Sequence, residues 1–108
     1  KDQPSGKFKP KVQEKLFQDG SKYWGELIDG RRSNKGIYFY KNGDTYIGDW
    51  RDDKFHGHGY YIFAKGERYE GELVQGYKQG YGEYHYLNGN SYKGQWREDK
   101  KQGHGVYT

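Results

Sequence analysis

Histidine is the residue type in this chain best suited to bind a metal ion or to move a proton. His56 and His58 lie two residues apart, and His104 is flanked by glycines as His58 is. A zinc site needs three or four ligands, but no further ligand lies near this pair and the chain has no cysteine. We therefore interpret these histidines as structural residues near turns and predict no metal site.

Other side chains could in principle catalyse a reaction, but their spacing argues against it. Glu26, Asp49 and Glu72 recur at one interval and so are spread along the chain, as solvated charges on strands would be. The Gly-x-Gly pairs resemble phosphate-binding loops, but no helix pattern follows them. No nucleophile, base and orienting group can be assembled. We predict no catalytic residue and no cofactor, and hence no enzyme activity.

The interval that separates these residues is the main feature of the sequence. Tyrosines at a period of 23 residues open four copies of one pattern: Tyr23, Tyr46, Tyr69 and Tyr92. In the second copy Tyr46, Gly48 and Trp50 alternate with other residues, and Gly57, Gly59, Tyr61 and Phe63 follow. A fixed period of this length is typical of a repeat protein whose copies stack on their neighbours.

Each copy reads as two short strands, because its residues alternate with a period of two. Asn42-Gly43 and Asn88-Gly89 separate the copies. Such a pair favours a type I′ hairpin turn, in which both central residues have positive φ. The glycine two residues after each tyrosine predicts that an aromatic ring crosses close to bare backbone. The predicted fold is all-β, a meander of consecutive antiparallel hairpins.

The pattern resembles the MORN (membrane occupation and recognition nexus) repeat, whose motif is Tyr-x-Gly-x-Trp, a Gly-Lys turn, His-Gly-x-Gly and a closing Gly. The second copy matches this motif best, through Tyr46, Gly48, Trp50, Lys54, His56, Gly57, Gly59 and Gly66, with Asp53 at the turn Gly. Leu27 and Leu73 replace the Trp in the first and third copies. The resemblance implies an elongated, single-layer, twisted antiparallel sheet that binds proteins, dimerises or touches phospholipid.

The domain organisation follows from the repeat. Residues 1–14 are a basic linker or arm, or a strand laid on the sheet through Phe8 and Val12. Residues 15–108 form the array: a partial repeat at 15–22, repeats at 23–45, 46–68 and 69–91, and a truncated repeat at 92–108. Because the chain stops within a repeat, we expect it to continue or to make an end-to-end contact through its C-terminal repeat.

The function that we predict is a non-catalytic protein–protein interaction scaffold within a larger assembly. By analogy with the family, we expect an intracellular, cytoskeletal or ciliary (axonemal) complex. The predicted partner-binding residues are apolar and lie opposite the repeat aromatics: Trp24, Ile37, Phe39, Ile47, Tyr60 and Ile62. Exposed clusters of this kind mark interaction sites, unless the N-terminal arm or another part of the protein covers them.

The alternative is binding to phosphoinositides or anionic membranes, with or without an attached catalytic domain. The net charge is +4, and basic residues lie near the expected hairpin turns: Arg31, Arg32, Lys35, Lys54, Lys78, Lys100 and Lys101. Such a row could attract anionic headgroups, although neighbouring acidic residues reduce its net positive charge. No basic stripe with regularly presented aromatics is evident, so we predict no nucleic-acid partner.

Overall fold

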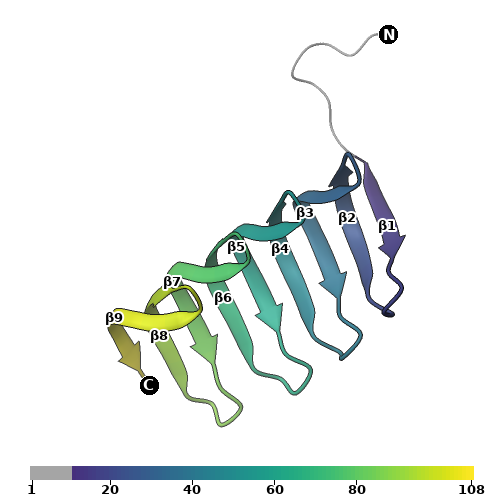
Figure 1. The fold of residues 1–108 in the computed structure, drawn as a ribbon. Coiled ribbons are helices and arrows are strands. Elements are labelled where there is room, and N and C mark those ends of the chain that lie inside the picture. Colours follow the sequence, from purple (N-terminus) through teal and green to yellow (C-terminus); the bar gives the residue numbers. More distant parts are fainter. Residues whose placement is uncertain (1–10) are drawn as a thin grey trace.

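The computed structural model describes residues 11–108 as one antiparallel sheet of nine strands, in which spatial order follows chain order (Figure 1). The fold is therefore the predicted all-β meander, a single layer of stacked hairpins. The strands are β1 (Val12–Leu16), β2 (Lys22–Ile28), β3 (Arg31–Phe39), β4 (Thr45–Arg51), β5 (Lys54–Ile62), β6 (Arg68–Val74), β7 (Tyr77–His85), β8 (Ser91–Arg97) and β9 (Lys100–Tyr107). None of the described residues forms a helix that could cross a membrane.

The sheet begins earlier than the sequence indicates. Gln13 and Glu14, which we assigned to the arm, pair with Gly25 and Trp24 as part of β1. An N-terminal strand therefore lies on the array, in agreement with the alternative prediction through Val12. Phe8, the other residue of that prediction, lies outside the described residues.

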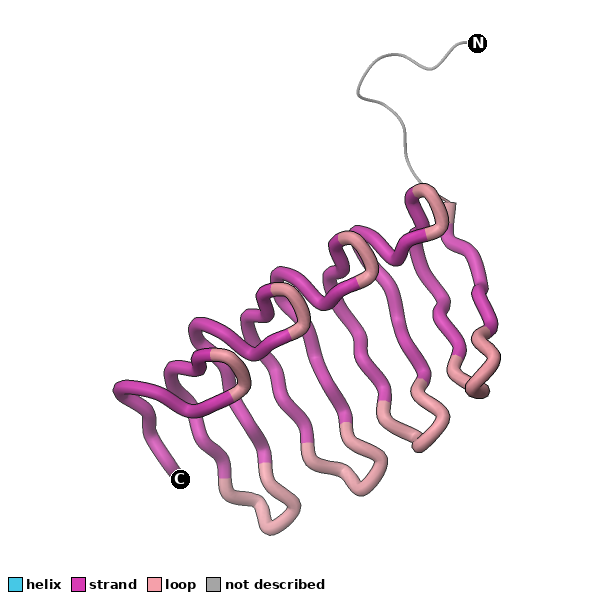
Figure 2. Tube along the Cα trace, viewed as in Figure 1, coloured by secondary structure: helices cyan, strands magenta, loops and turns pink. Residues whose placement is uncertain are grey.

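Two kinds of turn alternate along the chain. The turns within repeats lie at one end of the strands, and the loops between repeats lie at the other end (Figure 2). Within a repeat, Asp52 and Asp53 both have positive φ, 49° and 70°, as a type I′ turn requires. In the loop between the first two repeats, Gly43 has positive φ but Asn42 does not, and the Gly43 N–H donates to the Tyr40 carbonyl at 3.0 Å. The prediction of type I′ turns at Asn-Gly was therefore wrong, because these connections are longer loops closed by a left-handed glycine.

Each return strand bends, and the bend divides the sheet into an inner and an outer face. Phe55 and Tyr61 are six residues apart on β5, which a straight strand would place about 20 Å apart, yet their ring centroids are 6.2 Å apart. A register shift lies opposite this bend, between Gly48 and Trp50 of β4. We call the concave side of this bend (Figure 1) the inner face. Phe55 and Tyr61 lie on this face, as does Tyr46, whose ring stacks on that of Phe55.

The core of this thin sheet consists of tyrosine rings lying over glycine backbone. Tyr23, Tyr46 and Tyr69 are fully buried. A methyl group added at Gly59 would lie 2.6 Å from two ring atoms of Tyr46, so only glycine leaves room for the ring. The Tyr46 hydroxyl donates to the Asp49 carbonyl at 2.8 Å. The predicted crossing of aromatic rings over bare backbone is confirmed.

Candidate interaction surfaces

A continuous ladder of buried and half-buried aromatic rings lines the inner face. Tyr38 and Tyr40 have ring centroids 4.6 Å apart, and Tyr40 lies 5.5 Å from Tyr61 in the next repeat. Tyr61 is 4.8 Å from Phe63, which is 5.9 Å from Tyr84. The ladder continues the 23-residue period and passes from repeat to repeat without interruption. It forms the apolar floor of a trough.

Two hollows lie along this floor, one on each side of Phe55. The first, of about 260 Å³, is lined by Tyr40, Phe55, Tyr61, Phe63, Tyr69, Leu73, Gly76, Lys78 and Asp99. The second, of about 270 Å³, is lined by Arg32, Tyr38, Tyr40, Trp50, Asp53, Lys54, Phe55, Gln75 and Gly76. Both combine aromatic walls with charged rims. Recesses of this composition suit large apolar side chains of a protein ligand.

A cation on the inner face ties each tryptophan-containing repeat to the preceding one. The Arg32 backbone N–H and Nε both donate to Asp53 Oδ1, at 2.7 and 2.9 Å. The Arg32 guanidinium also lies 4.8 Å from the Trp50 ring centroid. Burial tends to raise the pKa of Asp53, but the hydrogen bonds from Arg32 outweigh it and hold this pKa below its ordinary value. We call this arrangement a polar junction.

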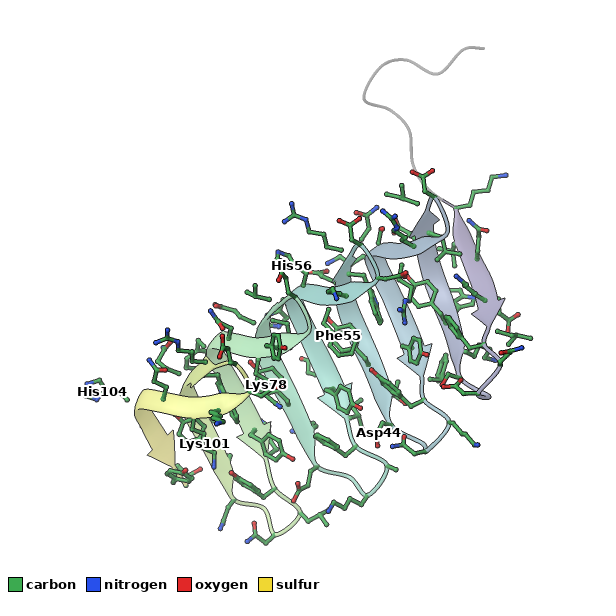
Figure 3. The ribbon with its side chains drawn as sticks, in the orientation of Figure 1. Asp44, Phe55, His56, Lys78, Lys101 and His104 are labelled. Atoms are coloured by element: carbon green, nitrogen blue, oxygen red, sulfur yellow. The ribbon has the colours of Figure 1, made fainter. Side chains whose placement is uncertain are left out.

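The same junction recurs one repeat pair further along. The Lys78 N–H donates to Asp99 Oδ1 at 2.8 Å, and Lys78 Nζ lies 3.6 Å from the same oxygen. Lys78 also lies over the Trp96 ring, 5.5 Å from its centroid. Figure 3 shows Phe55, Lys78 and Lys101 following one another along the inside of the bend.

The junction between these two is apolar. Phe55 occupies the repeat position of Arg32, and its ring stacks on Tyr46 with centroids 4.1 Å apart. Leu73 replaces the tryptophan and Gly76 replaces the aspartate, while the Gly76 N–H still donates to the Phe55 carbonyl at 2.9 Å. Because leucine is smaller than tryptophan, this junction leaves the first hollow open beside Leu73.

Carboxylates stand on the other lip of the trough, beside the loops between repeats. Asp44 accepts a hydrogen bond from the Tyr61 hydroxyl at 2.8 Å and one from the Ala64 N–H at 2.7 Å. Glu67 accepts from the Tyr84 hydroxyl at 2.8 Å, one repeat further on. Burial and the bond to Asp44 both raise the pKa of Tyr61 above its ordinary value. These bonds fix the orientation of the aromatic rings in the trough.

The predicted partner-binding residues lie on the outer face, and the sheet register brings them together. Trp24 pairs with Ile37, Ile37 with Ile47, and Ile47 with Tyr60, so that these four form one row across strands β2 to β5. Phe39 and Ile62 flank this row in the next row of the sheet, separated by Thr45. Trp24, Phe39, Ile47 and Tyr60 are exposed, and Ile37 and Ile62 are half-buried. Whether a partner binds there stays a prediction.

The basic residues of the lipid alternative do not form one row. Arg32 and Lys78 lie in the polar junctions, with side chains only 19% and 20% exposed. Lys35 pairs with Asp49, and Arg31 lies 3.9 Å from Asp52. Lys101 covers the rings of Tyr86, Tyr92 and Tyr107 on the inner face. In residues 11–108, only Lys54 and Lys100 of the seven remain as exposed cations without such a contact.

The histidines do not converge on one point. His58 Nε2 lies 3.7 Å from Glu70 Oε2, whereas His56 Nε2 lies 3.5 Å from Arg51 Nη1. His104 points away from the sheet near its C-terminal end (Figure 3). Among the described residues, no group of three or more potential ligands could hold a metal ion.

The inner-face trough was not predicted from the sequence. The repeat aromatics were predicted only to cross close to bare backbone, and Arg32 and Lys78 were grouped with the basic residues of the lipid alternative. A signal was present, because Arg32, Phe55 and Lys78 share one repeat position that the motif does not specify. A large or basic side chain kept at that position predicts a contact across the junction between repeats.

Comparison with known proteins identifies the repeat. The family model described as MORN repeat matches residues 23–45, 46–68, 69–91 and 92–108. A segment of 42 residues is 40% identical to a protein named inactive protein tyrosine kinase pTKL from Plasmodium falciparum, and covers 39% of this chain and 3% of that protein. The protein of the same name from Plasmodium berghei is 40% identical over 38 residues, which is 35% of this chain and 3% of the relative.

Proposed function

The chain belongs to the MORN repeat family, and from this premise we propose that it is a non-catalytic scaffold module that holds a protein segment in its inner-face trough. MORN repeats form interaction modules rather than catalytic domains. The observation that carries the proposal is the uninterrupted ladder of rings from the buried Tyr38 through the half-buried Tyr40, Tyr61 and Phe63 to Tyr84. Aromatic side chains supply large contact area at low conformational cost and dominate binding energy at protein interfaces.

The arrangement of polar groups supports a protein ligand. Lys54 lines the second hollow at one lip of the trough, and Asp44 and Glu67 stand on the other lip. A bound segment with apolar residues along its centre, acidic residues on one side and basic residues on the other would pair with the charges of both lips. An anionic membrane surface would be attracted by the positive charge of the first lip but repelled by the carboxylates of the second lip.

Two adjacent residues on opposite faces provide a matched test. Phe63 lines the first hollow on the inner face, whereas Ile62 lies on the outer face. We expect crosslinking pull-downs from native extract to recover a defined set of proteins with the wild type and with Ile62→Asp, and we expect Phe63→Asp to lose proteins from this set. Circular dichroism must show that both variants are folded. If Phe63→Asp loses no protein that Ile62→Asp retains, the trough is refuted as a binding surface.

The lipid function remains a second proposal, on the remaining cations Lys54 and Lys100. It requires flotation with vesicles that contain phosphoinositide, with binding that falls as salt is added. A double change of these two lysines to glutamate should abolish that flotation. Flotation that is unchanged by this substitution would refute this headgroup site.

By analogy with the family, we place the module in a cytoskeletal or ciliary assembly within the cell. An end-to-end contact through the C-terminal repeat is part of the same proposal. A fluorescent fusion of the protein should colocalise with microtubule or axonemal markers. A diffuse distribution, unchanged by Phe63→Asp, would contradict this placement.

A further inference from the structure

The outer face carries a second surface whose geometry specifies a partner. The row of Trp24, Ile37, Ile47 and Tyr60 crosses four consecutive strands. Trp24 is 50% exposed, and Ile47 and Tyr60 are 39% and 38% exposed. A hollow of about 250 Å³ lies beside this row, lined by Val12, Trp24, Gly25, Glu26, Lys35, Gly36, Ile37, Ile47 and Gly48. We call the four residues the outer row.

The row is confined to the first half of the array, and acidic residues limit it at both ends. Glu14 pairs with Trp24 at one end, and Glu70 pairs with Tyr60 at the other. Glu83 lies opposite Glu70 on the next strand, so two carboxylates extend the line of the row. Lys93 follows Glu83 in register, and His58 and His85 approach Glu70 and Glu83 at 3.7 and 3.4 Å.

The spacing of the row fits a helix better than a strand. Neighbouring strands are about 4.8 Å apart, so the row runs about 14 Å across the sheet. Side chains at i, i+3, i+7 and i+10 on one face of a helix advance by about 4.5–6 Å along its axis at each step. Side chains on one face of a strand repeat at about 6.7 Å and would drift out of register with the row.

We propose that the outer row binds an amphipathic helix of a protein partner, whose apolar stripe ends one to two turns before a Lys or Arg that pairs with Glu70 and Glu83. These carboxylates lie about 5 and 10 Å beyond Tyr60 at the strand spacing, which is about three and seven residues of helix. The hollow beside Ile37 and Ile47 receives a large apolar side chain from the helix. This surface is independent of the inner-face trough.

The test uses the full chain and two synthetic, hydrocarbon-stapled helices of about 16 residues, which span the row and the carboxylates at about 1.5 Å per residue. Both helices carry the same leucine stripe, and they differ only in Lys or Glu at the positions beyond it. We expect the Lys helix to bind at least about tenfold more tightly than the Glu helix. Ile47→Asp should abolish binding, and the inner-face variant Phe63→Asp should not alter it.

Charge reversal keeps the proposal testable if Ile47→Asp does not fold. Glu70→Lys changes a surface residue and should reverse the preference, so that the Glu helix binds more tightly. Equal binding of both helices to the wild type would overturn the proposal, as would a preference that Glu70→Lys does not alter. Self-association or binding to phosphatidylserine vesicles that Ile47→Asp abolishes would also overturn it, because the row would then bind a second copy or a membrane.

Discussion

Replacement of a single glycine tests whether tyrosine rings on bare backbone hold the array together. Gly59→Ala would place a methyl group 2.6 Å from the Cε1 and Cζ atoms of Tyr46, whereas carbon atoms pack at about 3.5–4.0 Å. The ring must therefore move by about 1 Å. It cannot do so freely, because Trp50 and Phe55 lie 5.1 and 4.1 Å from its centroid.

The magnitude follows from three contributions. Overpacking costs about 1–3 kcal/mol, and weakening the bond from the Tyr46 hydroxyl to the Asp49 carbonyl adds about 0.5–1.5 kcal/mol. Alanine is otherwise preferred to glycine in a strand by about 0.5–1 kcal/mol, which offsets part of this cost. We expect Gly59→Ala to lower the free energy of unfolding by about 2–3 kcal/mol.

Urea unfolding followed by circular dichroism measures this change, and a double-mutant cycle identifies its origin. In a Tyr46→Leu background the clash is absent, so Gly59→Ala should be neutral or slightly stabilising. A cost below about 1 kcal/mol in the wild-type background would refute the reasoning. An equal cost in both backgrounds would do so as well, because the ring would then not be the cause.

Three further predictions concern the junctions and the tyrosines. Asp53→Asn should lower the free energy of unfolding by about 1 kcal/mol at neutral pH, a modest loss because the site is partly exposed. Hydrogen bonds from Arg32 lower the pKa of Asp53 in the folded protein below its ordinary value of 3.8. The stability that Asp53 contributes is therefore present above about pH 4 and is lost as the pH falls further. Urea titrations of both proteins at several pH values measure this loss. Burial raises the pKa of Tyr23 and of Tyr40 to about 12 from an ordinary 10.0. Stability should therefore fall between about pH 10 and 12, less steeply for Tyr40→Phe, and an identical slope would contradict this. Finally, Phe55→Arg with Gly76→Asp should install a polar junction, with a favourable coupling of at least about 0.5 kcal/mol in a double-mutant cycle; additive single effects would argue against it.

The strand register could be predicted from the sequence because strand side chains alternate with a fixed period of two. Once Tyr46 and Trp50 were assigned to one face, Ile47 had to lie on the other, and a 23-residue period repeats that assignment in every copy. The resulting row of Trp24, Ile37 and Ile47 is what the structure contains. Neither the turn types nor the bend could be obtained in this way. Asp52 and Asp53 adopt positive φ without the glycine that normally signals it.

The trough escaped prediction because it depends on that bend. In a straight strand Phe55 would lie far from Tyr61, and the two rings would not enclose a hollow together. The bend follows from a register shift between Gly48 and Trp50, where two strands of unequal length pair. An alternation pattern does not encode such a shift. The trough was therefore not predicted, although the rings of Tyr40, Tyr61 and Phe63 along it are only half-buried.

The residues at the junctions vary together, which explains why the trough is uneven along its length. Trp50 and Trp96 each come with a cation in the preceding repeat and an aspartate in the turn: Arg32 with Asp53, and Lys78 with Asp99. Leu73 comes instead with Phe55 and Gly76. An aspartate opposite Phe55 would have no cation to pair with, and a cation beside Leu73 would lose the indole face that stabilises it. Each set is therefore consistent only as a whole, and the array alternates between charged junctions and an apolar one. A ligand in the trough would meet the hollow beside Leu73 at the apolar junction, between two charged ones, and the order of these junctions along the array would determine which segments fit.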